Sequence, residues 1–201
     1  QKGQKQKALD LLPQLENGSS RLWLQLTRYL ATLTAKTDPP LQEQVAEVQL
    51  ATLNKLRANM PQLAPPQQRR VAQRRAEALH ALGRREEALK LYQQLAREQP
   101  DNRAIQIEYA ETLLNSEDES TLSEAIVQWQ KVARRVRRGS DAWLKARYCI
   151  ALALFKRNRP NDRALAAQRL EYLKATVDLE ANRWRGKVNE LLQRCKQTDS
   201  R

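Results

Sequence analysis

The side chains best suited to catalysis or metal binding are few in this chain, and their spacing favours neither. His80 is the only histidine among 201 residues, so a His-centred catalytic triad or metal cluster has little to build on. Cys149 and Cys195 lie far outside the short spacings that cysteine metal ligands show. The stretch Gly83-Arg84-Arg85 lacks the other residues of a phosphate-binding loop. We therefore expect no enzyme activity, no cofactor and no metal.

The strongest electrostatic candidate is a basic run at residues 134–138. Its four arginines are Arg134, Arg135, Arg137 and Arg138. A helix C-terminus gains a few tenths of a kcal/mol from each nearby cation, and four cations exceed that need. The run is therefore a candidate anion patch, in a chain whose net charge is +13. A second basic cluster at residues 69–75 lies on a different type of helix, which argues against one continuous basic stripe.

The tryptophans and cysteines fit a packed core better than a binding surface. Tryptophan side chains could stack on nucleic-acid bases, but here they recur at helical spacing with Leu and Ala, which indicates core packing. The four tryptophans are Trp23, Trp129, Trp143 and Trp184. Cys149 and Cys195 each lie on an apolar helical stripe, so we expect buried free thiols.

Neither a membrane-spanning run nor a signal peptide is visible in the sequence. No stretch of eighteen apolar residues occurs, so we expect no membrane span in this fragment. The chain opens at Gln1 rather than Met, and we interpret it as the C-terminal repeat fragment of a longer bacterial protein. Its compartment, cytoplasm or cell envelope, stays open.

Composition and periodicity predict a chain made of helices. Ala, Leu, Gln, Arg and Glu dominate, only 5 glycines occur, and no alternating strand pattern is present. We predict helices near residues 4–16, 20–35, 41–59, 66–82, 85–98, 102–115, 121–137, 140–157, 162–175 and 180–196. Thr121 and Glu124 are predicted to form a capping box. Other predicted N-caps are Asp101 or Asn102, Ser140 or Asp141, and Asp162.

An internal repeat organises these helices. An alanine is followed by a large apolar residue four positions later and by another after three more, and this recurs at near-constant spacing. The five instances are Ala8/Leu12/Leu15, Ala46/Leu50/Leu53, Ala88/Tyr92/Leu95, Ala125/Trp129/Val132 and Ala166/Leu170/Leu173. The small alanine allows two helices to approach closely, while the larger residues fill the groove between them.

The segment from Arg69 to Asn102 resembles the tetratricopeptide repeat, a helix–turn–helix unit of about thirty-four residues. The matching positions are Ala76, Leu79 at the family's tyrosine, Gly83 at the turn, Ala88, Tyr92 and Pro100. The sequence departs from the family pattern at Ala72 and Arg75, which replace its leading Trp and its first-helix Leu. The later units are stretched, with Asn158 in place of the turn glycine, a residue that also adopts the left-handed conformation.

This resemblance implies an all-α fold, a right-handed α-α superhelix of antiparallel helix pairs in one domain over residues 1–201. The expected parts are a half repeat at 1–17, helix pairs at 20–59, 66–100, 102–138 and 140–175, and a capping helix at 180–196. Other helix-pair solenoids remain an alternative outside the best repeat.

The resemblance also implies a function, a non-catalytic scaffold that binds a protein or peptide partner on the concave face lined by first helices. The implied binding positions are Gln73, Glu77, His80, Ile107, Glu111, Leu114, Tyr148 and Leu152. The alternative is binding of nucleic acid or an anionic surface through the arginine clusters. A third hypothesis is assembly of a larger chain or a homo-oligomer, since the sequence leaves the oligomeric state open.

Overall fold

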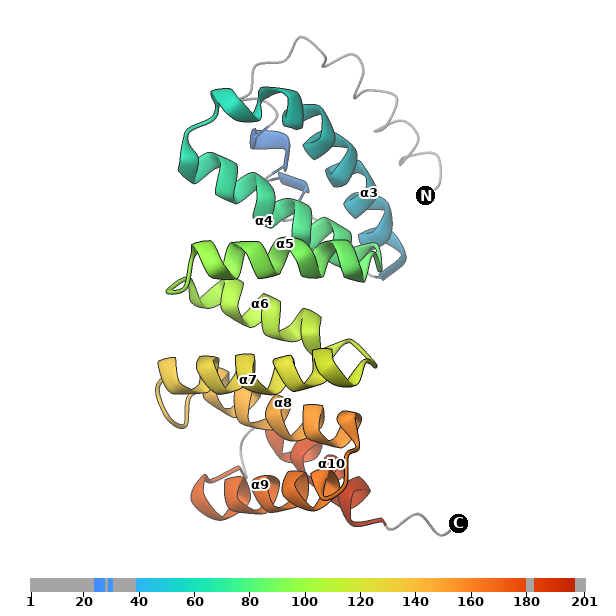
Figure 1. Ribbon diagram of the computed structural model, residues 1–201, viewed down its shortest axis with the longest axis vertical. Helices are drawn as coiled ribbons and strands as arrows, with labels where there is room; N and C mark the ends of the chain where they lie inside the picture. The colour runs from blue at the N-terminus through green and yellow to red at the C-terminus, as the bar shows by residue number, and fades with distance from the viewer. Residues whose placement is uncertain (1–23, 28, 31–38, 180–182, 198–201) are drawn as a thin grey trace. The chain divides into compact units, whose positions relative to one another are not determined.

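The computed structural model describes residues 24–27, 29–30, 39–179 and 183–197, and these residues form helices and short loops without a strand (Figure 1). The helices are α3 (Pro39–Leu56), the 3-10 helix η2 (Arg57–Gln62), α4 (Pro65–Ala81), α5 (Arg85–Glu98), α6 (Arg103–Leu114), α7 (Glu119–Arg135), α8 (Asp141–Arg157), α9 (Asp162–Thr176) and α10 (Trp184–Lys196). The all-α prediction is confirmed. The predicted helix at 4–16, the half repeat at 1–17, the Ala8 motif and Trp23 lie outside the described residues.

The chain divides into two compact units, Gln1–Gln99 and Pro100–Arg201. In the first unit α4 packs against both α3 and α5, and in the second each helix from α6 to α10 packs against the next. Consecutive helices are joined by short loops, which makes them antiparallel neighbours. Each unit is therefore built from helices that pack against their neighbours in the sequence.

The repeated alanine motif supplies the contacts between these helices. All four of its alanines in the described residues have no exposed surface, and the larger residues that follow them are buried as well. The buried motif residues are Ala46, Leu50, Leu53, Ala88, Tyr92, Leu95, Ala125, Trp129, Val132, Ala166, Leu170 and Leu173. The periodicity thus identified the buried side of α3, α5, α7 and α9 correctly.

Two helix starts follow the prediction, while a third begins earlier than predicted. The side chains of Asn102 and Ser140 accept hydrogen bonds from the backbone N–H groups of the third residue beyond them, so both are N-caps. The capping box predicted at Thr121 and Glu124 is wrong. Asp118 caps α7 instead, and its Oδ2 accepts bonds from the backbone N–H and the hydroxyl of Thr121, each at 2.8 Å. Because Asp118 precedes Thr121 by three positions, Thr121 already lies within the first turn.

Two of the turns between paired helices contain residues with a positive φ. Gly83, between α4 and α5, has φ +69°, and Asn158, after α8, has φ 54°, as the sequence predicted for both. The prediction that Asp162 caps α9 is wrong, because Asn161 holds the N-cap position and Asp162 is the first helical residue. Asp162 binds Arg157 and the backbone of Arg159 instead.

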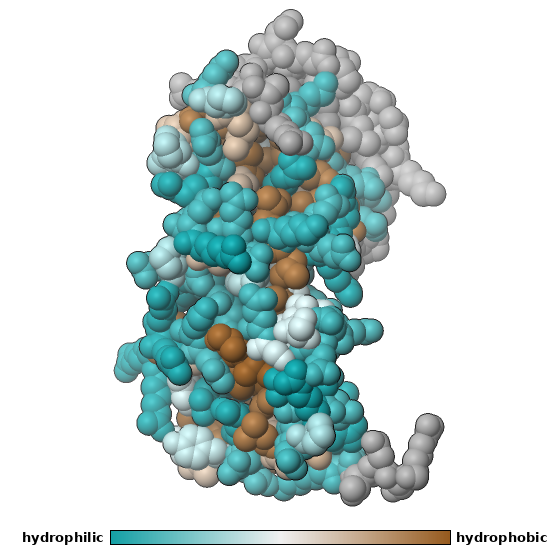
Figure 2. All heavy atoms as spheres, viewed as in Figure 1, coloured by the Kyte–Doolittle hydropathy of each residue, from teal (hydrophilic) through white to brown (hydrophobic). Residues whose placement is uncertain are grey.

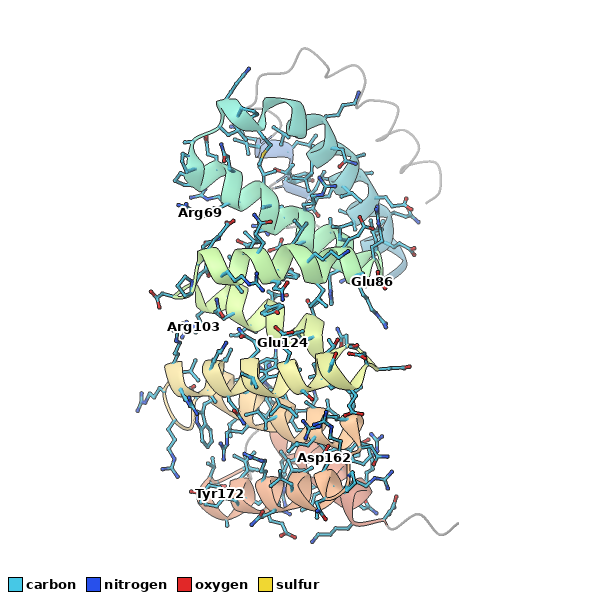
Figure 3. The ribbon with its side chains drawn as sticks, viewed as in Figure 1. Arg69, Glu86, Arg103, Glu124, Asp162 and Tyr172 are labelled. Carbon is cyan, nitrogen blue, oxygen red and sulfur yellow. The ribbon has the colours of Figure 1, made fainter. Side chains whose placement is uncertain are left out.

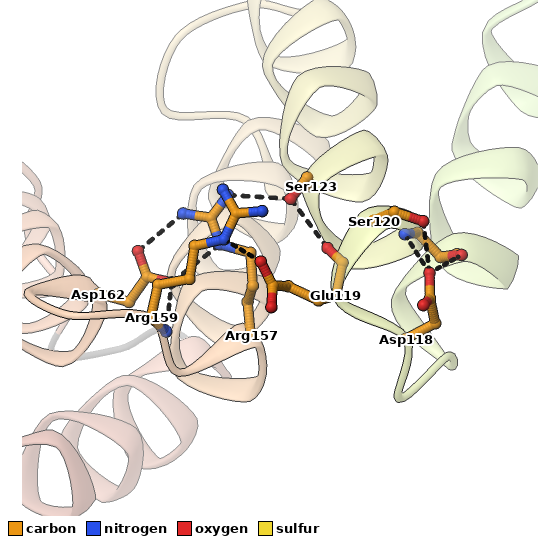
Figure 4. A network of polar contacts seen from close by, with 8 residues as sticks. Asp118, Glu119, Ser120, Ser123, Arg157, Arg159 and Asp162 are labelled. Carbon is orange, nitrogen blue, oxygen red and sulfur yellow. Dashed lines mark hydrogen bonds and ion pairs between the residues drawn. The ribbon is translucent and has the colours of Figure 1, made fainter.

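The turn between α8 and α9 is held by a polar network that also reaches α7 (Figure 4). Arg157 donates two hydrogen bonds to the carboxylate of Asp162, at 2.8 and 2.7 Å, and a third to the hydroxyl of Ser123 at 3.1 Å. Arg159 forms an ion pair with Glu119. Bidentate arginine–carboxylate pairs fix geometry as well as charge, so this network sets how α8, α9 and the start of α7 meet.

Candidate partner-binding site

The first helices of the second unit, α6 and α8, together with α10, form a continuous surface that we call the first-helix face. Lys145 of α8 forms an ion pair with Glu111 of α6. Lys156 of α8 donates 2.8 Å hydrogen bonds to the backbone carbonyls of Leu114 and Ser116. At the other side of α8, the ring of Tyr148 lies 5.5 Å from that of Trp184 in α10, measured between centroids.

The predicted positions on α6 occupy different depths of this face. Ile107 and Glu111 are half-buried. Leu114 is buried, with 7% of its surface exposed, so it supports the face from beneath. The pairing of Glu111 with Lys145 across two helices holds that carboxylate at a fixed place. A fixed charge beside an apolar side chain is suited to orienting a bound chain.

The predicted positions on α8 give the face its aromatic and apolar character. Tyr148 and Leu152 lie one turn apart and are both half-buried. Burial raises the pKa of the Tyr148 hydroxyl, first of all because the charged form is poorly solvated there. A neutral tyrosine with an accessible edge can contribute both apolar contact and a hydrogen bond to a partner.

A small pocket that the sequence did not reveal lies between α8 and α10. Its volume is about 290 Å³, and Lys145, Arg183, Trp184 and Lys187 line it. The Lys187 ammonium is 5.1 Å and the Arg183 guanidinium 5.6 Å from the centroid of the Trp184 ring. Cations over an aromatic face are attracted by its quadrupole. The pocket therefore combines one aromatic ring with three cations. Lys145 and Arg183 are paired with Glu111 and Asp141, so Lys187 is the pocket cation without an ion pair among the described residues, and it suits an acidic group of a peptide.

Asp141, at the start of α8, holds two of these pocket side chains in position. It accepts hydrogen bonds from Arg183 Nε and from Trp184 Nε1, both at 2.8 Å. These bonds, that from Arg183 first, lower the pKa of the Asp141 carboxyl. The ionised carboxylate thus holds the N-terminal end of α10 against the N-terminal end of α8.

The predicted positions on α4 lie in the first unit and form a polar row of their own. Gln73, Glu77 and His80 are half-buried. Glu77 accepts a 3.0 Å hydrogen bond from Gln73 Nε2 and a 2.6 Å bond from Arg74 Nη1. Gln73 and Arg74 also line a hollow of about 770 Å³ in that unit. The row offers hydrogen-bonding groups rather than an apolar anchor.

The four arginines of the predicted anion patch are all exposed, and two of them contact other parts of the unit. Arg135 turns to the start of its own unit, where it donates to the Pro100 carbonyl and lies 3.6 Å from an Asp101 carboxylate oxygen. Arg138 turns the other way, with its guanidinium carbon 6.0 Å from the centroid of the Trp143 ring. Arg134 and Arg137 remain as exposed cations between them.

The remaining candidates for chemistry include the two cysteines. Cys149 and Cys195 are buried free thiols, as predicted, and burial raises the pKa of Cys149 to about 12. In the described residues no three His, Cys, Asp or Glu side chains are grouped so that they could hold a metal ion. None of the described helices is long and apolar enough to cross a membrane.

The second-helix surface of the same unit differs in character. Figure 2 shows mostly hydrophilic side chains over the surface on which α7 and α9 lie, with hydrophobic atoms visible between these two helices. Val127 of α7 and Leu165 of α9 are exposed large hydrophobic residues, with 49% and 37% of their surfaces accessible. Single exposed aliphatic residues of this kind are normal on a protein surface.

Helix pairs joined by tight turns, with a small residue buried at the same place in each, define an α-helical repeat protein. The comparison with known families then gives the family. Residues 69–112 match the tetratricopeptide repeat family, over α4, α5 and α6 up to Thr112. These residues carry a tetratricopeptide repeat, a unit of a family whose members generally mediate protein–protein interactions and are typically not catalysts. No curated protein and no solved structure matches the chain.

Proposed function

We propose that this chain is a non-catalytic scaffold that binds a protein or peptide segment on its first-helix face. The observation that carries the proposal is the juxtaposition of Tyr148 and Leu152 with the cationic pocket around Trp184. An apolar anchor with a few well-placed polar groups is the usual composition of a recognition site. The family's general role in protein interaction supports the same conclusion.

The expected partner is a peptide with one large apolar side chain and a neighbouring acidic group. The apolar side chain would contact Tyr148 and Leu152, while the carboxylate would lie beside Lys187 in the pocket. Ile107 and Glu111 would extend the contact along α6. The α4 row of Gln73, Glu77 and His80 is proposed as a further contact region in the first unit.

The nucleic-acid alternative gains no specific support. Two of its four arginines, Arg135 and Arg138, contact Pro100 and Trp143 rather than forming one patch. A filter-binding titration with RNA and DNA at two salt concentrations tests it directly, because phosphate-dominated binding weakens steeply with salt. Retention of RNA or DNA that falls steeply with added salt would favour that alternative.

The proposal is tested by selecting peptides from a random displayed library against the purified chain. Affinities of synthetic versions are then measured by fluorescence anisotropy for the wild type, Leu152→Glu and Val127→Glu. Both variants place the same charge on the same unit, but only Leu152 lies on the first-helix face. We expect Leu152→Glu to weaken binding at least about tenfold, the loss of one well-buried apolar contact. No enriched peptide, or an equal loss in Val127→Glu, would overturn the proposal.

A further inference from the structure

Three arginines from separate elements converge at one corner of the second unit. Arg138 lies in the loop between α7 and α8, Arg147 on α8 and Arg169 on α9. The guanidinium carbons of Arg138 and Arg147 are 6.0 and 5.5 Å from the centroid of the same Trp143 ring. We call these three side chains the arginine corner.

Electrostatic interactions link Arg147 to the other two arginines. The pKa of Arg147 is lowered, first by burial and then by the positive charges of Arg169 and Arg138. Tyr172 of α9 also interacts with Arg147, and Figure 3 shows it towards the end of α9 that lies nearest the α7–α8 loop. Half of the Tyr172 side chain is exposed. The corner is thus a group of like charges beside an accessible aromatic ring.

No carboxylate neutralises the arginine corner within the part of the chain that the structure describes. Other arginines of the same unit have acidic partners, as Arg157 has Asp162 and Arg183 has Asp141. Arg138, Arg147 and Arg169 form no such pair with a described residue. The Nε of Arg169 is enclosed by the protein without a hydrogen-bond acceptor among those residues. A buried donor without an acceptor costs free energy, so Arg169 is held in the corner without a compensating partner at this atom among the described residues.

The chemistry of the corner favours a compact anion with several oxygens. Guanidinium groups present planar pairs of N–H donors that match the oxygens of a phosphate group, and they remain charged at any physiological pH. Like charges held together raise the free energy of the empty site, and a dianion offsets that repulsion. A single carboxylate has fewer oxygens and half the charge of a phosphate monoester. The corner therefore suits a phosphate monoester better.

The position of the corner favours a phosphorylated side chain over nucleic acid. Nucleic-acid binding needs cations that follow a backbone of successive phosphates, whereas these arginines meet at one point. Trp143 has only 8% of its surface exposed, so it is not a platform for base stacking. We propose that Arg138, Arg147 and Arg169 bind the phosphate group of a phosphorylated side chain in a protein partner. The proposal rests on the proposed function only in that its ligand is a protein segment.

The test compares two degenerate peptide pools that differ in one group. One pool carries a central phosphoserine between random residues, and the other carries serine. Binding is measured by fluorescence anisotropy at about 150 mM salt for the wild type, for Arg147→Gln/Arg169→Gln and for Arg134→Gln/Arg137→Gln. The two double variants remove the same charge, but only the first removes it from the arginine corner. Arg138→Gln, in an exposed loop, removes a corner charge without risk to the helices.

We expect the phosphoserine pool to bind the wild type at least tenfold more tightly than the serine pool. The corner variants should lose this difference, and Arg134→Gln/Arg137→Gln should keep it. Equal binding of the two pools, or an equal loss in both double variants, would overturn the proposal. So would single-stranded RNA that binds more tightly than the phosphoserine pool and depends on the same arginines.

A further variant separates this proposal from the proposed function. Leu152→Glu alters the first-helix face but leaves the arginine corner intact. In that variant the phosphoserine pool should therefore still bind more tightly than the serine pool, by the same factor as in the wild type. If the displayed library yields no peptide but the phosphoserine pool binds through the corner, the proposed function fails while this inference holds.

Discussion

The ring of Tyr148 packs against that of Trp184 at 5.5 Å between centroids, with the two planes tilted by 43°. Aromatic pairs in such a tilted arrangement contribute about 1 kcal/mol beyond their buried area. The contact joins α8 to α10, and Trp184 Nε1 also donates a hydrogen bond to the carboxylate of Asp141 at the start of α8. α10 therefore packs against α8 and contributes to the first-helix face.

Replacing Trp184 should weaken the packing of α10 against the rest of the second unit. Trp184→Ala removes both the ring contact and the bond to Asp141, and we expect it to destabilise the second unit by roughly 3–5 kcal/mol. Trp184→Phe keeps a ring and should cost less. Amide hydrogen exchange in α10 measures the effect residue by residue. Unchanged exchange of the α10 amides in Trp184→Ala would contradict the role of this contact.

Ala125 tests the close approach of helices that the repeat requires. It has no exposed surface and lies on α7, which packs against both α6 and α8. Ala125→Leu should lower the free energy of unfolding by about 1–3 kcal/mol, because a well-packed helix interface has no room for the larger side chain. Val127→Leu, two residues along on the exposed side, should change it by less than about 0.5 kcal/mol. Denaturant titrations of both variants decide between packing and helix propensity.

Gly83 and Gly186 should respond to alanine with opposite signs. Gly83 has φ +69°, where a side chain is strained, so Gly83→Ala should destabilise the fold by about 1 kcal/mol. Gly186 lies inside α10 with nothing within 4 Å of an added Cβ. Gly186→Ala should therefore stabilise α10 by up to about 1 kcal/mol. Thermal melts that shift in the same direction for both variants would contradict this account.

Asp162 should contribute stability that depends on pH. The bonds from Arg157 lower its pKa in the folded state. Its contribution is therefore complete above the ordinary aspartate pKa of about 3.9 and is lost as the pH falls through the lower folded value. We expect Asp162→Asn to cost about 2 kcal/mol between pH 5 and 7, since a bond to a charged group is lost. The difference from wild type should shrink below about pH 4.

The matched control is Asp101→Asn, because 95% of the Asp101 side chain is exposed. Its ion pair with Arg135 should contribute less than about 0.5 kcal/mol at any pH. Urea titrations across this pH range compare the two variants. If the free energy of unfolding of Asp162→Asn differed from that of the wild type by the same amount down to pH 2, the charge of the Asp162 carboxylate would not be the source of the stability.

The fold was largely predictable from sequence because its signals are local. The spacing of Ala125, Trp129 and Val132 along one helix identifies the side that is buried, whatever that side packs against. The same reasoning placed Gly83 and Asn158 at turns, since few residues adopt a positive φ. The same reasoning predicted the wrong N-cap where two nearby residues could both cap the same helix. Asp118 and Thr121 can both cap a helix, and the carboxylate three residues earlier took that role.

The site was less predictable because its contacts join residues far apart in the chain. The family register suggested Tyr148 and Leu152, and both lie half-buried on the first-helix face. The pairing of Lys145 with Glu111, and the pocket beside Trp184, depend on how successive pairs are placed. A cation three residues after Trp184 was the only sequence signal for that pocket, and this pattern occurs on many exposed helices. Trp184 was predicted as core, and it is buried while its edge lines the pocket.

The most direct measurement of partner binding on the first-helix face is site-specific photo-crosslinking. p-Benzoylphenylalanine is placed at Leu152 in one protein and at Val127 in another, and each is irradiated with a peptide selected from the displayed library. Mass spectrometry then gives the yield of the covalent adduct. We predict an adduct at position 152 and none above background at position 127. A strong adduct at position 127 with none at position 152 would contradict the central claim.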